Sequence, residues 1–216
     1  MLADLVAVMD RLRSPGGCPW DAEQTHASLL PYAVEEVHEV VEAVESGDRE
    51  HLREELGDLL LQVVFHARIA QEHPDDPFGL DEVAAGLAAK LRRRHPHVFG
   101  DVESEGDVTD DVDVPGRWER IKQAEKARES VLDGVPATMP ALARAQKVVG
   151  RLRRAGLLTE ALAALDEHDS PGLGRRLLDT VVAADLDGVD AAAELRAQLR
   201  ELEGRARVVE RARQGG

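Results

Sequence analysis

The sequence predicts an all-α protein organised as an antiparallel helical bundle. Apolar residues recur at helical spacing through most of the 216 residues, and no segment shows the regular alternation of a half-buried strand. Glycine and proline separate the helical segments, as at Ser14-Pro15-Gly16-Gly17 and at Pro74-Asp75-Asp76-Pro77. Because aromatic residues make up only 3% of the chain, aliphatic side chains must fill the core.

The N-terminal part is expected to contain four helices in a row. The first is short and amphipathic, and a compact segment, CPWDAEQTHASL, follows it. An acidic helix begins near Pro31, and the fourth helix is stopped by Pro96, because proline disfavours a helical conformation in the residue before it. The expected ranges are 2–13, about 31–46, 49–72 and 80–94.

A change of composition follows the fourth helix. Seven carboxylates lie between Asp101 and Asp113 with almost no apolar residue to pack, so this stretch is expected to be a solvated loop. Trp118 then opens another helix that runs to about residue 130. The loop and this helix are expected to complete the first domain.

The remaining residues are expected to form a separate helical region. Pro136 and Pro140 mark the boundary, which gives one domain at 1–135 and a helical region at 136–216. Within the second region, Ser170-Pro171 marks one break between helices.

A symmetric arrangement of acids surrounds Gly47. Gly47 suits the left-handed residue that ends a helix and Asp48 suits an N-cap, so the flanking helices should fold back on each other. One pair of acids lies eight residues from Gly47 on either side and a second pair eleven residues away, about 12 and 16 Å from the turn. The four acids are Glu36, Glu39, Glu55 and Asp58. They should therefore meet on facing helices.

Such a cluster of carboxylates favours a bound cation. Two carboxylates about 5 Å apart repel each other by ~3 kcal/mol at an effective dielectric constant near 20. Carboxylate oxygens suit Mg²⁺ or Mn²⁺, and metal sites of this kind are often built between facing helices. The alternative is a solvated acidic face, which accounts for the first helix but poorly for the second, where Glu55 and Asp58 precede an apolar run at 59–65.

Composition narrows the class of protein further. The net charge of −15 argues against binding a nucleic-acid polymer, and no apolar run is long enough to span a membrane. The N-terminus lacks the basic segment of a signal peptide, and Cys18 is the only cysteine, which excludes intrachain disulfides and thiolate zinc sites. The sequence therefore predicts a cytoplasmic protein that does not bind membranes.

The second region contains a weak internal echo of the first. At an offset of 117 residues, LGDLLLQVVFHA at 56–67 aligns with LGRRLLDTVVAA at 173–184. None of the four acids is retained in the copy, where Asp58 corresponds to Arg175 and Glu36 to Arg153. A degenerate second repeat and a chance match between two Leu/Val-rich helices are both open.

The motifs of the first domain resemble the MazG family of nucleoside triphosphate pyrophosphohydrolases. The motifs occur in the family's order, and they are GCPWDAEQTHASL, EEVHE, EELGD, KLRRRHPHVFGD and RWERIKQAEK. The resemblance implies an all-α NTP pyrophosphatase fold with a four-helix core completed by homodimerisation. It also implies Mg²⁺-dependent cleavage of a nucleoside triphosphate to the monophosphate and pyrophosphate, and the carboxylate ligands would accept Mn²⁺ as a substitute. The acids that hold the metal in the family match Glu36, Glu39, Glu55 and Asp58.

Other residues gain candidate roles from the same resemblance. Basic residues near a helix C-terminus often only complement the helix dipole, but the matching KxxRR segment of the family contacts nucleotide phosphates. This favours Lys90, Arg93 and Arg94 as triphosphate ligands. Trp118 is either a core residue or, as in the family, a stacking partner near the base. Apart from the resemblance, Glu35 is a candidate general base because it adjoins the predicted metal ligands, although a metal-bound hydroxide could suffice and Glu35 could also lie on the far side of its helix.

Two functions of different class remain. The first is house-cleaning hydrolysis of nucleoside triphosphates with broad base specificity. The second is a nucleotide sensor or helical interaction module that keeps the metal site without turnover. The apolar run at 59–65 surrounds its helix more completely than one antiparallel partner can cover, which favours a homodimer, although residues 173–184 could supply the cover within one chain.

Overall fold

The computed structural model describes residues 1–99, 129–166 and 172–214. In these ranges the regular secondary structure is helical throughout and contains no strand, which confirms the all-α fold. The chain divides into two compact units, Met1–Asp107 and Val108–Gly216. The domain division that the sequence suggests at residues 135 and 136 stays a prediction.

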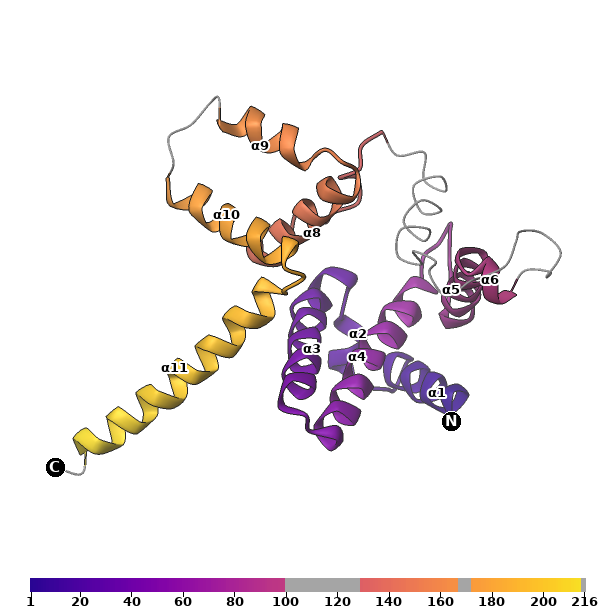
Figure 1. The fold of residues 1–216 in the computed structure, drawn as a ribbon. Coiled ribbons are helices and arrows are strands. Elements are labelled where there is room, and N and C mark those ends of the chain that lie inside the picture. Colours follow the sequence, from indigo (N-terminus) through magenta and orange to yellow (C-terminus); the bar gives the residue numbers. More distant parts are fainter. Residues whose placement is uncertain (100–128, 167–171, 215–216) are drawn as a thin grey trace. The chain divides into compact units, whose positions relative to one another are not determined.

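The first unit is built on one long antiparallel helix pair, α3 and α4 (Figure 1). The shorter helices α1 and α2 precede this pair, and α5 and α6 follow it. The helices span Leu2–Arg13 (α1), Pro19–Glu23 (α2), His26–Ser46 (α3), Arg49–Ala70 (α4), Leu80–Arg94 (α5) and Pro96–Phe99 (α6).

Helix α3 begins five residues earlier than the sequence suggested, at His26 and not near Pro31. Its start is fixed by a capping box, in which the Ser28 N–H donates to Thr25 Oγ1 (3.1 Å) and the Thr25 N–H donates to Ser28 Oγ (2.9 Å). Pro31 lies inside the helix near this end. The expectation near Pro31 was wrong because local capping chemistry outweighs the loss of a single helical hydrogen bond at proline.

The predicted turn between α3 and α4 is confirmed. Gly47 has φ +74°, and its N–H donates to the Val44 carbonyl at 3.2 Å. The Asp48 carboxylate accepts hydrogen bonds from the N–H groups of Glu50 (3.0 Å) and His51 (3.1 Å), which lower the pKa of Asp48. Helix α4 ends at Ala70 rather than residue 72, and α5 has the predicted range 80–94.

The core of the first unit lies where α1 and α3 meet α4. Met9, Leu29, Val64 and Phe65 are each at most 3% exposed and form one apolar cluster. The rings of Trp20 in α2 and Phe65 form a T-shaped pair, with their centroids 6.4 Å apart. Trp20 itself remains 50% exposed, and α4 supplies the centre of the core.

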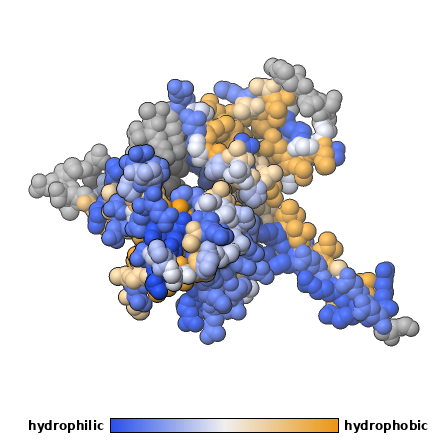
Figure 2. Space-filling view, turned by 180° about the vertical axis from the view of Figure 1, so that it is seen from behind, coloured by the Kyte–Doolittle hydropathy of each residue, from blue (hydrophilic) through white to orange (hydrophobic). Residues whose placement is uncertain are grey.

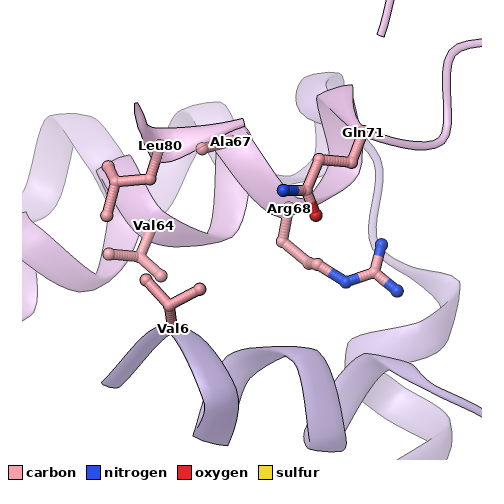
Figure 3. Close-up of a pocket in the computed structure, with 6 residues that line it drawn as sticks. All are labelled: Val6, Val64, Ala67, Arg68, Gln71 and Leu80. Atoms are coloured by element: carbon pink, nitrogen blue, oxygen red, sulfur yellow. The ribbon is translucent and has the colours of Figure 1, made fainter. Parts of the chain in front are cut away.

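A small gap remains where α1, α4 and α5 meet. Figure 3 shows Val6, Val64 and Leu80 gathered around it, with the polar side chains of Arg68 and Gln71 nearby. The gap holds about 10 Å³, which is room for no more than one water molecule. It is therefore a packing imperfection between the helices and is too small for a nucleotide.

Polar contacts fasten the end of α4 that lies far from Gly47. Arg13 of α1 binds the Glu72 carboxylate through Nε (2.8 Å) and a terminal nitrogen (2.9 Å), and Arg13 is the main cause of the lowered pKa of Glu72. His26 Nδ1 and His66 Nδ1 lie 2.7 Å apart and join the start of α3 to α4. Burial, followed by the nearby His26, lowers the pKa of His66, so its neutral form is favoured.

The second unit contains four helices among its described residues. Val149 of α8 and Val181 of α10 are its most buried apolar side chains. In α11 no residue is buried, and Figure 2 shows apolar side chains along one side of this helix. The ranges are Ala141–Arg154 (α8), Leu158–Asp166 (α9), Leu173–Leu186 (α10) and Ala191–Gln214 (α11). The break predicted at Ser170-Pro171 lies outside the described residues.

The two segments of the internal echo are both helical. Residues 56–67 lie in α4, and residues 173–184 lie in α10, which packs against α8. The arginines that replace Glu36 and Asp58 are paired, Arg153 with Asp185 (2.5 Å) and Arg175 with Asp179 (2.8 Å). These positions thus carry ion pairs in place of a carboxylate cluster, and the degenerate repeat stays a prediction.

Candidate metal centre

The α3–α4 hairpin brings three of the four predicted acids together. One carboxylate oxygen from each of Glu36, Glu39 and Glu55 lies within 4.8 Å of the other two. Glu55 is buried, and the two α3 acids are half-buried. In the part of the chain that the structure describes, this is the one group of three or more metal-binding side chains at such distances.

Asp58 lies outside this close trio but belongs to the same electrostatic environment. It is half-buried on α4, and its charge is the second-largest cause of the raised pKa of Glu36. In a cation complex, Asp58 would have to approach from the edge of the cluster or act on the cation through a water molecule.

The clustering raises the pKa of two of these acids. For Glu36 the causes are burial, then the charges of Asp58 and Glu39, a hydrogen bond with the Glu39 carboxyl and the charge of Glu55. For Glu55 the main causes are burial and the charge of Glu39. Because both values lie higher in the folded state, the stabilising contribution of these groups is complete below their usual pKa of 4.5 and is lost as the pH rises through the raised values. A bound cation would relieve this cost at neutral pH.

Two further residues of α4 had no role in the sequence prediction. His51 Nε2 lies 2.9 Å from Glu55 Oε1, and the i, i+4 spacing of the two residues could have indicated this contact. Gln62 is buried in α4, and its side-chain oxygen has no hydrogen-bond partner. A glutamine inside an apolar run was the available signal, but only the packed fold shows that it is buried.

The acids present suit a hard divalent cation. All three close ligands offer carboxylate oxygens, the donors that Mg²⁺ and Mn²⁺ prefer. Adjacent oxygens on an octahedral Mg²⁺ are about 3.0 Å apart, since each Mg–O bond is about 2.1 Å. The three oxygens would therefore have to move closer together than their present spacing of up to 4.8 Å to bind one ion.

The basic residues of α5 differ in their surroundings. Arg93 is exposed, Lys90 is half-buried and Arg94 is buried with 7% of its surface exposed. The three predicted triphosphate ligands therefore differ in how accessible they are, and Arg94 is the least accessible. Burial depends on tertiary packing that helical spacing cannot show.

The structure gives only single observations on the remaining residues of interest. Glu35 is exposed beside Glu36. His95 Nδ1 lies 2.7 Å from the Leu91 carbonyl oxygen at the end of α5, which supports a structural role for His95. Trp118 lies outside the described residues. Among the described residues, no helix is both long and apolar enough to cross a membrane.

Comparison with known proteins gives a consistent set of relatives. A model of the MazG nucleotide pyrophosphohydrolase domain matches residues 24–99, which include α3, α4, α5 and α6. A Streptomyces cacaoi protein described as an uncharacterized 26.1 kDa protein in the blaB 3′ region is 52% identical over 198 residues, covering 91% of this chain and 77% of the relative.

Relatives named nucleoside triphosphate pyrophosphohydrolase are similarly close. The Escherichia coli (strain K12) protein is 47% identical over 156 residues, covering 70% of this chain and 57% of the relative. The Mycolicibacterium smegmatis protein is 44% identical over 214 residues, covering 98% of this chain and 60% of the relative. The chain thus spans between about half and two thirds of the length of these two relatives.

Proposed function

Because this chain belongs to the MazG nucleotide pyrophosphohydrolase family, we propose that it hydrolyses nucleoside triphosphates to the monophosphate and pyrophosphate with Mg²⁺ as cofactor. The observation that carries the proposal is the convergence of Glu36, Glu39 and Glu55 on the α3–α4 hairpin. The relatives named as nucleoside triphosphate pyrophosphohydrolases support the substrate class. A free nucleotide as substrate also fits the cytoplasmic location that the sequence predicts.

Each candidate residue has a distinct part in this proposal. Glu36, Glu39, Glu55 and Asp58 would hold Mg²⁺, or Mn²⁺ in its place. When bound, the cation would polarise the phosphate oxygens and make a bound water molecule more acidic. Lys90, Arg93 and Arg94 would balance the negative charge that develops on the pyrophosphate leaving group. Glu35, exposed next to the ligands, is the proposed general base.

We propose broad base specificity, as expected of an enzyme that cleans the nucleotide pool. All of the proposed ligands except Trp118 act on the cation or on phosphate groups, which every nucleoside triphosphate shares. Trp118 would stack near the base, and stacking tolerates all bases because each has a flat aromatic face.

Pyrophosphate release from a panel of canonical and modified triphosphates, with and without Mg²⁺, tests the function. We expect Mg²⁺-dependent release of pyrophosphate from several bases at comparable rates. Binding of triphosphates without release would instead indicate the sensor or interaction module. Strong selectivity for one base would contradict the broad base specificity but not the hydrolysis of nucleoside triphosphates.

We further propose that the enzyme is a homodimer joined through the α3–α4 hairpin. Each of the two helices carries a stripe of exposed apolar residues. On each helix, these residues follow by one position the residues that face the other helix of the same hairpin. These stripes are Leu30, Val34, Val37 and Val44 on α3, and Leu56, Leu60 and Val63 on α4. Viewed along a common axis, residues of antiparallel helices advance in opposite rotational senses, so both stripes face the same side of the hairpin. A second hairpin packed on that side would complete a four-helix core.

Val34→Glu and Leu60→Glu are expected to convert the dimer to a monomer, because each would bury a charge in the proposed interface. Light scattering on the full chain should give twice the chain mass for the wild type and the chain mass for both variants. Val8→Glu, at an exposed apolar residue of α1, is the matched control and should remain dimeric. A monomeric wild type would contradict the homodimer and favour cover from within the chain.

A further inference from the structure

Gln62 has an unsatisfied polar atom in the interior of the first unit. The residue is 7% exposed, and its Oε1 is the one buried side-chain oxygen or nitrogen without a hydrogen-bond partner among the described residues. A buried acceptor left unpaired costs about 1–3 kcal/mol. Since α4 already has a long apolar run, an apolar residue at this position would avoid the cost. We therefore expect Gln62 Oε1 to accept a hydrogen bond from a molecule that is not part of the chain.

The position of Gln62 indicates where that partner would lie. Gln62 follows Asp58 by four residues and Glu55 by seven, so all three share one face of α4. Helical side chains lean toward the N-terminus of their own helix, which directs Gln62 back over the turn that carries Asp58. On the antiparallel helix α3, the same rule directs Glu36 away from Gly47 and toward the level of Gln62. Helical geometry therefore directs the amide and the Glu36 carboxylate toward the same level of the hairpin from opposite helices.

The chemistry of the site restricts what the partner can be. The carboxylates of the cluster and the phosphates of a nucleotide offer acceptor oxygens, and Gln62 Oε1 is also an acceptor. A hydrogen-bond donor is required. Water molecules on Mg²⁺ present their hydrogens outward, because their lone pairs face the cation, and Mg²⁺ usually keeps several of them.

We propose that Gln62 is a positioning residue of the metal centre, whose Oε1 accepts a hydrogen bond from a water molecule on the cation. The proposal rests on the proposed function, since it requires the acids to hold Mg²⁺. Gln62 would orient this water and tighten cation binding without touching the cation. Outer partners of this kind typically change metal affinity by about 10–100-fold.

Calorimetric titration with Mg²⁺ alone, together with thermal melting with and without Mg²⁺, tests this role. In Gln62→Met, which keeps the length of the side chain but removes the acceptor, Mg²⁺ affinity should fall about 10–100-fold. The melting temperature of the metal-free variant should be equal to or above that of the wild type, because an unpaired amide has been removed. Gln62→Glu keeps an acceptor and should retain the wild-type Mg²⁺ affinity or exceed it.

Gln146→Met provides the matched control. Both polar atoms of the Gln146 amide have partners within the second unit, with the oxygen accepting from the Ala192 N–H (3.1 Å) and the nitrogen donating to Asp190 (3.3 Å). This variant should melt at a lower temperature with unchanged Mg²⁺ affinity. The same pattern in Gln62→Met would overturn the proposal, as would an equal loss of Mg²⁺ affinity in Gln62→Glu. If the wild type itself does not bind Mg²⁺, both the proposed function and the role of Gln62 fail. If the wild type binds Mg²⁺, Asp58→Ala abolishes this binding and Gln62→Met leaves it intact, only the role of Gln62 is overturned.

Discussion

Replacing Glu39 or Asp58 by alanine is expected to abolish triphosphate hydrolysis while leaving the metal-free fold at least as stable as the wild type. The catalytic loss should reach about 10³-fold or more, since a missing ligand removes several kcal/mol of charge stabilisation in the transition state. The metal-free fold should not suffer, because each substitution removes a negative charge that raises the pKa of a neighbouring acid. Activity and stability should therefore change independently.

Pyrophosphate release, Mg²⁺ calorimetry and thermal melting without metal would be measured on both variants. Glu42→Ala is the matched control, because Glu42 is an exposed acid one turn along α3 from Glu39. It should keep wild-type activity and Mg²⁺ affinity. If Glu42→Ala were as inactive as the ligand variants, or if Asp58→Ala kept full activity, the assignment of the metal centre would be wrong.

The second large effect is expected from the basic end of α5. Alanine at Lys90 or Arg93 should lower kcat/KM by about 10²-fold through the loss of a charged phosphate contact worth ~2–3 kcal/mol. Their contribution to stability should be small, at about 0.3–1 kcal/mol for charges near a helix end. Arg94→Ala should reduce kcat/KM and also lower the melting temperature, because this side chain is buried.

Steady-state kinetics and thermal melting separate these roles. Arg92→Ala is the control, since Arg92 is exposed in the same last turn and complements the same helix dipole. It should alter neither measurement appreciably. If Arg92→Ala and Arg93→Ala changed kcat/KM equally, the total positive charge at the helix end would matter, and specific phosphate contacts would not.

The helical hairpin and its cluster of acids could be predicted because they depend on local chemistry. Gly47 and Asp48 carry the signals of a helix end and a helix start, and both act within a few residues. Once the turn is placed, helical rise brings Glu39 and Glu55 to the same level. The structure brings their carboxylates within 4.8 Å of each other as part of the trio.

Other features could not be predicted because they depend on contacts between distant segments. The early start of α3 is an exception, because Thr25 and Ser28 cap each other locally and the prediction gave more weight to Pro31. The contact of His26 with His66 joins residues forty positions apart. The burial of Arg94 likewise requires the packed fold, since the sequence gives the spacing of charges along α5 but not which of them is covered.

The shortness of the connection between α3 and α4 restricts how the length of this protein can change. Only Gly47 and Asp48 separate the two helices, and both are needed to cap a helix end. An inserted residue would either displace one of these caps or rotate α4 by about 100° relative to α3, which would turn Glu55 away from Glu39. Natural length variation should therefore be rare at this connection. The segment between α4 and α5, where no predicted metal ligand lies, should tolerate it more readily.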